Sequence, residues 1–167
     1  MIADVGDAIF SAVSLRSRRQ AQFIAPGYYM SMGFAVPASI GVALAGNLRP
    51  YVLVGDGTFQ MTGVEISTIV RPGLNPVIIV LNNDGYGTMR SIRSGSFNTI
   101  TRWNYGQICA LVGGGESSIA STAAEFDAAL SRAEKSSQVH LIELRLPRTR
   151  ASKQLARIAA KVRKRRG

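Results

Sequence analysis

The chain has 167 residues, of which 46% are hydrophobic and 7% aromatic, and this composition predicts one globular domain and excludes a disordered chain. Cys109 is the single cysteine, so an intramolecular disulfide is excluded and a reducing compartment, the cytoplasm, is expected. The formal net charge is +10, but residues 1–147 hold 11 basic and 10 acidic residues, so the excess belongs to a tail and not to the domain.

Strands and helices are predicted to alternate along residues 1–147. Short apolar runs predict buried strands at 1–3, 51–54, 77–81 and 139–144. Predicted helices lie at 7–15, at 33–46, from about 61 to the stop at Pro72-Gly73, and at 122–135. The last of these begins with a capping box, Thr122 to Glu125, and residues 16–29 are interpreted as a loop. This order predicts a single three-layer α/β domain with a mostly parallel sheet and helices on both faces.

The tail, residues 148–167, is predicted to be a basic helix. Ser152 is a plausible N-cap, and an apolar stripe follows at helical spacing, made of Leu155, Ile158, Ala159 and Val162. Such a stripe favours docking on protein. The opposite face carries most of the nine basic residues, Arg148, Arg150, Lys153, Arg157, Lys161, Arg163, Lys164, Arg165 and Arg166. We expect no sequence-specific nucleic-acid binding, because the tail has no aromatic side chain on which a base could stack.

No membrane span is expected. An uncharged stretch, residues 30–48, contains Pro37 and many small residues. It is therefore interpreted as a buried helix. Cys109 and the single histidine, His140, are interpreted as core residues.

Two polar segments directly follow predicted strands. Gly55-Asp56-Gly57-Thr58 offers a carboxylate between two glycines, and about two dozen residues later Asn82-Asn83-Asp84-Gly85-Tyr86 offers amide oxygens. Ligands of open α/β sheets bind at the carboxyl ends of strands. Mg²⁺ prefers oxygen ligands and often shares them with phosphate, so the pair of segments predicts a magnesium and phosphate site.

This pair resembles the signature of the thiamine-diphosphate-dependent enzymes. Residues 28–34, 55–67 and 81–87 look like indolepyruvate, phenylpyruvate and pyruvate decarboxylases, and Phe97-Asn98, 103–105 and 141–143 also fit. The resemblance covers nearly all of residues 1–155. It implies that residues 1–147 form the C-terminal, diphosphate-binding domain of such an enzyme, with thiamine diphosphate and Mg²⁺ as cofactors.

The resemblance also assigns roles to individual residues. It implies that Mg²⁺ is bound by Asp56, by the side chain of Asn83 and by the carbonyl of Gly85. The residues implied to contact the diphosphate are Gly57, Thr58, Gly6 and Asp7. Met32 corresponds to the bulky residue that forces the cofactor into a V shape, and the backbone of Met30 to the acceptor for its amino group.

Two departures bear on activity. Relatives commonly have a glutamate six residues after the second asparagine, where this chain has Met89, which cannot transfer a proton. No catalytic residue is therefore assigned. The resemblance also implies that a separate pyrimidine-binding domain or subunit is needed in trans, in a homo- or hetero-oligomer, because 167 residues cannot include it.

The sequence thus predicts part of a 2-oxo acid decarboxylase, a lyase of the indolepyruvate or phenylpyruvate type that is not active alone. Two alternatives stay open. One is part of a carboligase similar to acetohydroxyacid synthase, although residues 83–87 favour the decarboxylases. The other is a degenerate, non-catalytic domain that binds the cofactor or a partner.

Overall fold

A computed structural model describes residues 1–16, 19, 22–46 and 48–164. Parts of the predicted loop at 16–29 and the last three residues of the predicted tail helix lie outside the described residues. Among the described residues, no helix combines the length and the apolar character needed to span a membrane.

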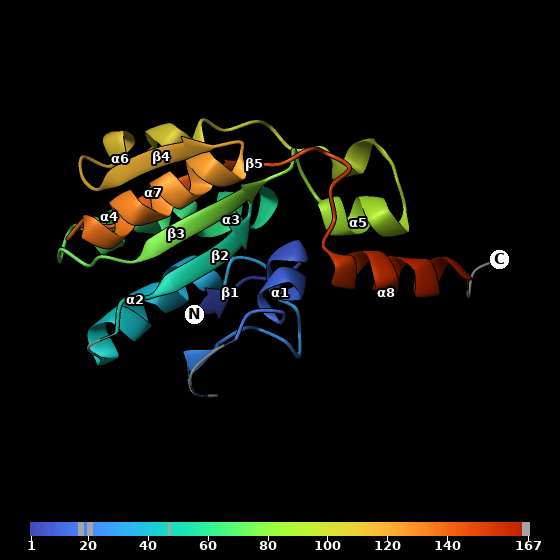
Figure 1. The fold of residues 1–167 in the computed structure, drawn as a ribbon, viewed down its shortest axis with the longest axis horizontal. Helices are drawn as coiled ribbons and strands as arrows, with labels where there is room; N and C mark the ends of the chain where they lie inside the picture. The colour runs from blue at the N-terminus through green and yellow to red at the C-terminus, as the bar shows by residue number, and fades with distance from the viewer. Residues whose placement is uncertain (17–18, 20–21, 47, 165–167) are drawn as a thin grey trace.

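A five-stranded parallel sheet forms the centre of the molecule, in the order β1-β2-β3-β5-β4 (Figure 1). The strands are β1 (Ile2–Ala3), β2 (Tyr51–Gly55), β3 (Val77–Asn82), β4 (Glu116–Ala120) and β5 (His140–Arg145). The predicted parallel sheet is confirmed. β4 was not predicted because it is an edge strand with a polar sequence, Glu-Ser-Ser-Ile-Ala, and so has no continuous apolar run.

Helices cover both faces of the sheet. The helices are α1 (Asp7–Ala12), α2 (Ala35–Ala45), α3 (Asp56–Thr62), α4 (Ile66–Val70), α5 (Gly87–Ile92), α6 (Ile108–Leu111), α7 (Ala123–Lys135) and α8 (Lys153–Lys164). Short 3-10 turns occupy Gly63–Glu65, Ser96–Asn98 and Tyr105–Gln107. One core cluster joins the sheet to α2, α3, α4 and α6, and a second joins it to α7. The three-layer α/β architecture is therefore as predicted.

The helix expected from about Met61 begins earlier, at Asp56, directly after β2. It is also divided at Thr62–Gly63, where the chain leaves helical geometry before the 3-10 turn and α4. The sequence did not predict this start because glycine has a low helix propensity, and Gly55 and Gly57 flank Asp56. The early start matters, since it places Asp56 in the first turn of α3.

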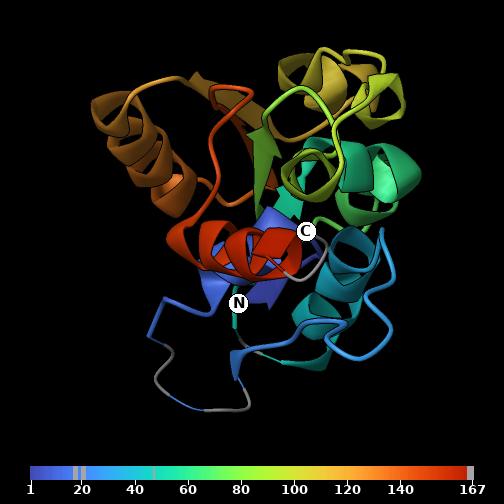
Figure 2. The ribbon, with the colours of Figure 1, turned by 90° about the vertical axis from the view of Figure 1, so that its right-hand side faces the viewer.

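The last helix, α8, packs against α1 and α5 at the carboxyl edge of the sheet (Figure 2). Leu155 and Ala159 of the predicted apolar stripe are buried, whereas Ile158 is 40% exposed. The polypeptide that leads into α8 is also fixed, since the N–H of Ser152 donates to Asp7 Oδ2 over 2.9 Å. The assignment of 148–167 as a separate tail stays a prediction.

Candidate functional site

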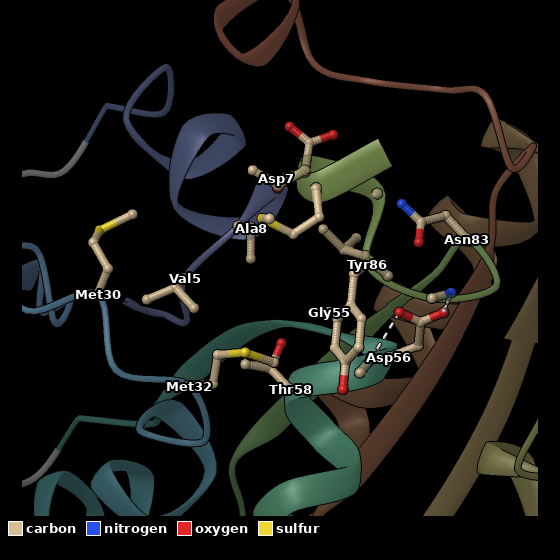
Figure 3. A pocket seen from close by; sticks show the side chains of 17 residues that line it. Val5, Asp7, Ala8, Met30, Met32, Gly55, Asp56, Thr58, Asn83 and Tyr86 are labelled. Carbon is tan, nitrogen blue, oxygen red and sulfur yellow. Dashed lines mark hydrogen bonds between the residues drawn. The ribbon is translucent and has the colours of Figure 1, made fainter. Parts of the chain in front are cut away.

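A cavity of about 250 Å³ opens at the carboxyl ends of β1, β2 and β3 (Figure 3). Four segments line it: the turn after β1, the loop before α2, the turn from β2 into α3, and the loop from β3 into α5. The residues to which the resemblance assigns a role all line this cavity, and so does Met89: Gly6, Asp7, Met30, Met32, Asp56, Gly57, Thr58, Asn83, Gly85 and Met89. The parallel sheet explains this, because it brings the ends of its strands to one edge.

Asp56 is buried at the start of α3, with its carboxylate held from both sides. Oδ1 accepts the N–H of Gly57 and Oδ2 accepts the N–H of Gly85, each over 2.8 Å. Burial raises the pKa of the Asp56 carboxyl above its ordinary value, while the two N–H groups and the charge of Arg90 act to lower it. The carboxylate therefore ties the β2 turn to the β3 loop and keeps lone pairs for a cation.

Both turns require glycine at one position. A Cβ at residue 57 would lie 2.5 Å from Cε1 of Tyr86, so a larger residue would displace this ring from the cavity wall. Gly85 has a positive φ of 122°, and a Cβ there would lie 2.2 Å from the carbonyl oxygen of Asn98. Gly57 thus permits the close approach of the β2 turn and the β3 loop, and Gly85 permits that of the β3 loop and the 3-10 turn Ser96–Asn98.

Asn83 is buried beside Asp56 and is held by Arg90 of α5. The Arg90 guanidinium donates from Nη2 to the Asn83 carbonyl over 2.8 Å and to Asn83 Oδ1 over 3.4 Å. The preceding Asn82 turns away from the cavity, and its Nδ2 donates to Glu143 Oε1 over 2.8 Å. The two adjacent asparagines therefore differ in their contacts: Asn82 anchors the β3 loop to β5, and Asn83 lines the cavity.

The loop before α2 places two methionines on the opposite wall (Figure 3). Met30 has φ 56°, a left-handed conformation that costs a non-glycine residue roughly 1–3 kcal/mol. The buried carboxylate of Asp4 fixes this loop to the end of β1, since it accepts N–H groups from Val5, Gly33 and Ala35. Burial raises the pKa of Asp4, and these N–H groups oppose the rise.

Asp7 contributes its backbone and not its charge to the cavity. In Figure 3 its carboxylate points away from Asp56 and Thr58. Oδ2 accepts the N–H of Ser152, and Oδ1 is buried without a hydrogen-bond partner among the described residues. This orientation lets an acidic residue line a cavity that is predicted to accept an anion.

The donor set fits a magnesium diphosphate. Asp56, the amide oxygen of Asn83 and the carbonyl of Gly85 are hard oxygen donors, the type that Mg²⁺ prefers. Among the described residues, no group of three or more His, Cys, Asp or Glu side chains lies close enough together to hold a metal ion. One carboxylate leaves coordination positions for phosphate oxygens, and Gly57, Thr58 and Gly6 line the adjoining space.

The fold and this cavity define an α/β domain that binds its ligand at the carboxyl ends of parallel strands. Residues 4–144 match the family model described as thiamine pyrophosphate enzyme, C-terminal TPP binding domain. The chain belongs to this family, whose members use thiamine diphosphate with Mg²⁺. The resemblance inferred from the sequence is confirmed at this level.

Three similar proteins place the chain within the family. It is 39% identical over 158 residues to an indole-3-pyruvate decarboxylase of Azospirillum brasilense. The matched residues make up 93% of this chain and 28% of the relative. It is 36% identical over 154 residues to an alpha-keto-acid decarboxylase of Mycobacterium leprae. The matched residues make up 89% of this chain and 27% of that relative. The Rhodococcus jostii RHA1 thiamine diphosphate-dependent 4-hydroxybenzoylformate decarboxylase shares the fold, with a TM-score of 0.68, 24% identity, and coverage of 75% of this chain and 25% of that one.

Sequence reasoning missed the residues that hold the site together. Asp4 carries a detectable signal, because it is a carboxylate directly after the first predicted strand. Arg90 carries none, since its role depends on the short helix α5, which was not predicted. Tyr86 and Thr88 also line the cavity, and Tyr86 was quoted only as part of the motif.

Proposed function

We propose that this chain supplies the magnesium and diphosphate half of the cofactor site in a 2-oxo acid decarboxylase of the indolepyruvate or phenylpyruvate type. The observation that carries the proposal is the convergence of buried Asp56 and buried Asn83, from two adjacent strand ends, on one cavity. The relatives at 39% and 36% identity, an indole-3-pyruvate decarboxylase and an alpha-keto-acid decarboxylase, support the reaction class.

In this proposal the residues divide by the part of the cofactor they meet. Asp56, Asn83 and the Gly85 carbonyl bind Mg²⁺. The residues that meet the diphosphate are Gly57, Thr58, Gly6 and Asp7, the last through its backbone. Met32 would support the bend of the cofactor, and the backbone of Met30 would accept a hydrogen bond from its amino group. When bound, the cofactor supplies the electron sink for loss of CO₂, while the protein binds and orients it.

The pyrimidine end needs a second domain. The chain spans about a quarter of the length of the curated relatives it matches, which are larger proteins. We propose that a pyrimidine-binding domain or subunit completes the site, in a homo- or hetero-oligomer. We therefore expect the 167-residue chain by itself to bind cofactor weakly and to release no measurable aldehyde from phenylpyruvate or indolepyruvate.

Calorimetric titration of the chain with thiamine diphosphate tests the proposal. We expect heat of binding with Mg²⁺ present and its loss on adding a chelator. Asp56→Ala should abolish the Mg²⁺-dependent part, and Asp127→Ala, which removes an exposed carboxylate on α7, should leave it unchanged. Binding that is insensitive to both the chelator and Asp56→Ala would contradict the metal assignment.

A non-catalytic domain is the second candidate, and Met89 is the observation that favours it. This residue is 48% exposed and lines the cavity at the position where the family resemblance implies a glutamate. Asp7 and Asp56 are the only carboxylates among the described residues that line the cavity, and neither faces the ligand space as a free acid. Cofactor binding without aldehyde release after addition of a relative's pyrimidine-binding domain would support this candidate.

A further inference from the structure

Arg90 lies at the point where α5, the β3 loop and the segment before α8 meet. Its Nη2 donates to the carbonyl and the amide oxygen of Asn83, and its Nη1 donates to the carbonyl of Arg148 over 3.0 Å. The planar guanidinium makes these bonds from one rigid group, so they fix its orientation. Arg90 therefore connects the backbone of the C-terminal segment to a residue that faces the cavity.

The contacts of Arg148 keep this connection in place. The Arg148 side chain donates from Nη2 to Thr99 Oγ1 over 2.7 Å, which fixes the segment to the loop after α5. Four residues later, the N–H of Ser152 donates to Asp7 Oδ2. The segment 148–152 is thus linked to two residues of the cavity wall, to Asn83 by way of Arg90 and to Asp7 directly.

The surroundings of Arg90 fit a residue that orients Asn83, and not a residue that itself contacts the cofactor. Asp56 and Asp84 act on the guanidinium as nearby negative charges, and Arg148 acts as a positive one. Arg90 does not line the cavity. Because an amide oxygen has two lone pairs, Asn83 Oδ1 can accept from Arg90 and still bind a cation.

We propose that Arg90 is a positioning residue for the cation ligand Asn83, and that the carbonyl of Arg148 holds it in place. This inference rests on the proposed function. Metal ligands that are oriented by a second group lose affinity, typically by 10–100-fold, when that group is removed. The C-terminal segment then contributes to cation affinity although none of its residues touches the cation.

The test is a Mg²⁺ titration of the full chain at a fixed, saturating concentration of thiamine diphosphate, followed by the fluorescence of Trp103, the single tryptophan. We expect Arg90→Met to raise the Mg²⁺ concentration at half-saturation by about tenfold or more. Arg90→Lys should recover part of this loss, because an ammonium can reach one of the carbonyls but cannot reproduce the fork. Arg93→Met is the matched control, since it removes an arginine from the same segment and leaves both bonds to Asn83 intact.

The outcomes separate this inference from the proposed function. If the wild-type chain shows no Mg²⁺-dependent binding, the proposed function fails. If the wild-type chain binds and Arg90→Met binds Mg²⁺ equally or more tightly, the proposed function stands and the role of Arg90 is wrong. A general structural role would lower the unfolding midpoint in Arg90→Met and Arg90→Lys alike without partial recovery of Mg²⁺ affinity, and this result would also overturn the inference.

Discussion

Cys109 illustrates, at the scale of a single residue, how burial controls chemistry in this chain. The residue lies in α6 within the larger core cluster, and its Sγ donates to the carbonyl of Glu116 over 3.2 Å. Burial raises the pKa of the Cys109 thiol above its ordinary value. The sequence-based interpretation of Cys109 as a core residue is therefore confirmed.

We predict that the Cys109 thiol reacts slowly with an alkylating reagent in the folded protein. The thiolate is the reactive form, and a raised pKa keeps it scarce at pH 8, while the surrounding core blocks access. Labelling followed by mass spectrometry should be at least tenfold faster in denaturant, where the pKa returns to about 8.5. Equal rates in the folded and unfolded chain would contradict this account.

Met89 is the residue at which a gain of function is expected. It stands at the cavity wall in α5, exposed to the ligand space. In the chain complemented with a pyrimidine-binding domain, we predict that Met89→Glu increases the rate of aldehyde release, because general acid–base help contributes about 10²–10⁴-fold.

The control for this prediction is Met89→Gln, which matches the glutamate in length and hydrogen bonding but cannot transfer a proton. It should stay at the rate of the unaltered chain. If the glutamate and glutamine variants show the same rate, position 89 takes no part in proton transfer in this protein.

Among the secondary-structure elements, α7 is the one whose start the sequence defines most sharply. Thr122 Oγ1 accepts the N–H of Glu125 over 3.2 Å, and Glu125 Oε2 accepts the N–H groups of Thr122 and Ser121. This is the capping box that was predicted, and the helix ends at Lys135 as expected.

We predict that Thr122→Ala lowers the free energy of unfolding by about 1 kcal/mol, because it leaves an N–H of the first turn without its side-chain acceptor. Thr122→Ser keeps the hydroxyl and should change the stability by only a few tenths of this amount. Urea denaturation followed by circular dichroism measures both. A loss of similar size in the serine variant would show that the threonine methyl group, and not the cap, is responsible.

Elements that depend on local sequence were predictable, and those that depend on the surrounding fold were not. Apolar runs fixed β2, β3 and β5, and the two polar segments after β2 and β3 indicated the cavity. The edge strand β4 and the short helix α5 have no such pattern, because their stability comes from neighbouring β5 and α8. The bonds of Asp4 and Arg90 were likewise hidden, since they join residues that only the folded chain brings together.

At the scale of the whole molecule, the helix α8 presents a basic face to solvent. Lys153, Arg157 and Lys161 are exposed on α8, while Leu155 and Ala159 of the same helix are buried against α1 and α5. Docking by its apolar side gives this helix a fixed outward basic face. A basic face attracts phosphate, but it carries no aromatic side chain for base stacking.

We therefore predict that the chain binds random-sequence DNA duplexes weakly, without sequence preference, and only at low salt. Each phosphate contact makes the logarithm of the affinity fall by about 0.9 per tenfold rise in salt, so binding should vanish at physiological ionic strength. Replacing Lys153, Arg157 and Lys161 together by glutamine should reduce this salt dependence while leaving the buried face of α8 intact. Fluorescence anisotropy of labelled duplexes, at low and physiological salt, measures both effects. Tight, sequence-selective binding at physiological salt that the triple variant loses would mean that α8 reads nucleic acid, because phosphate attraction alone cannot distinguish one duplex from another.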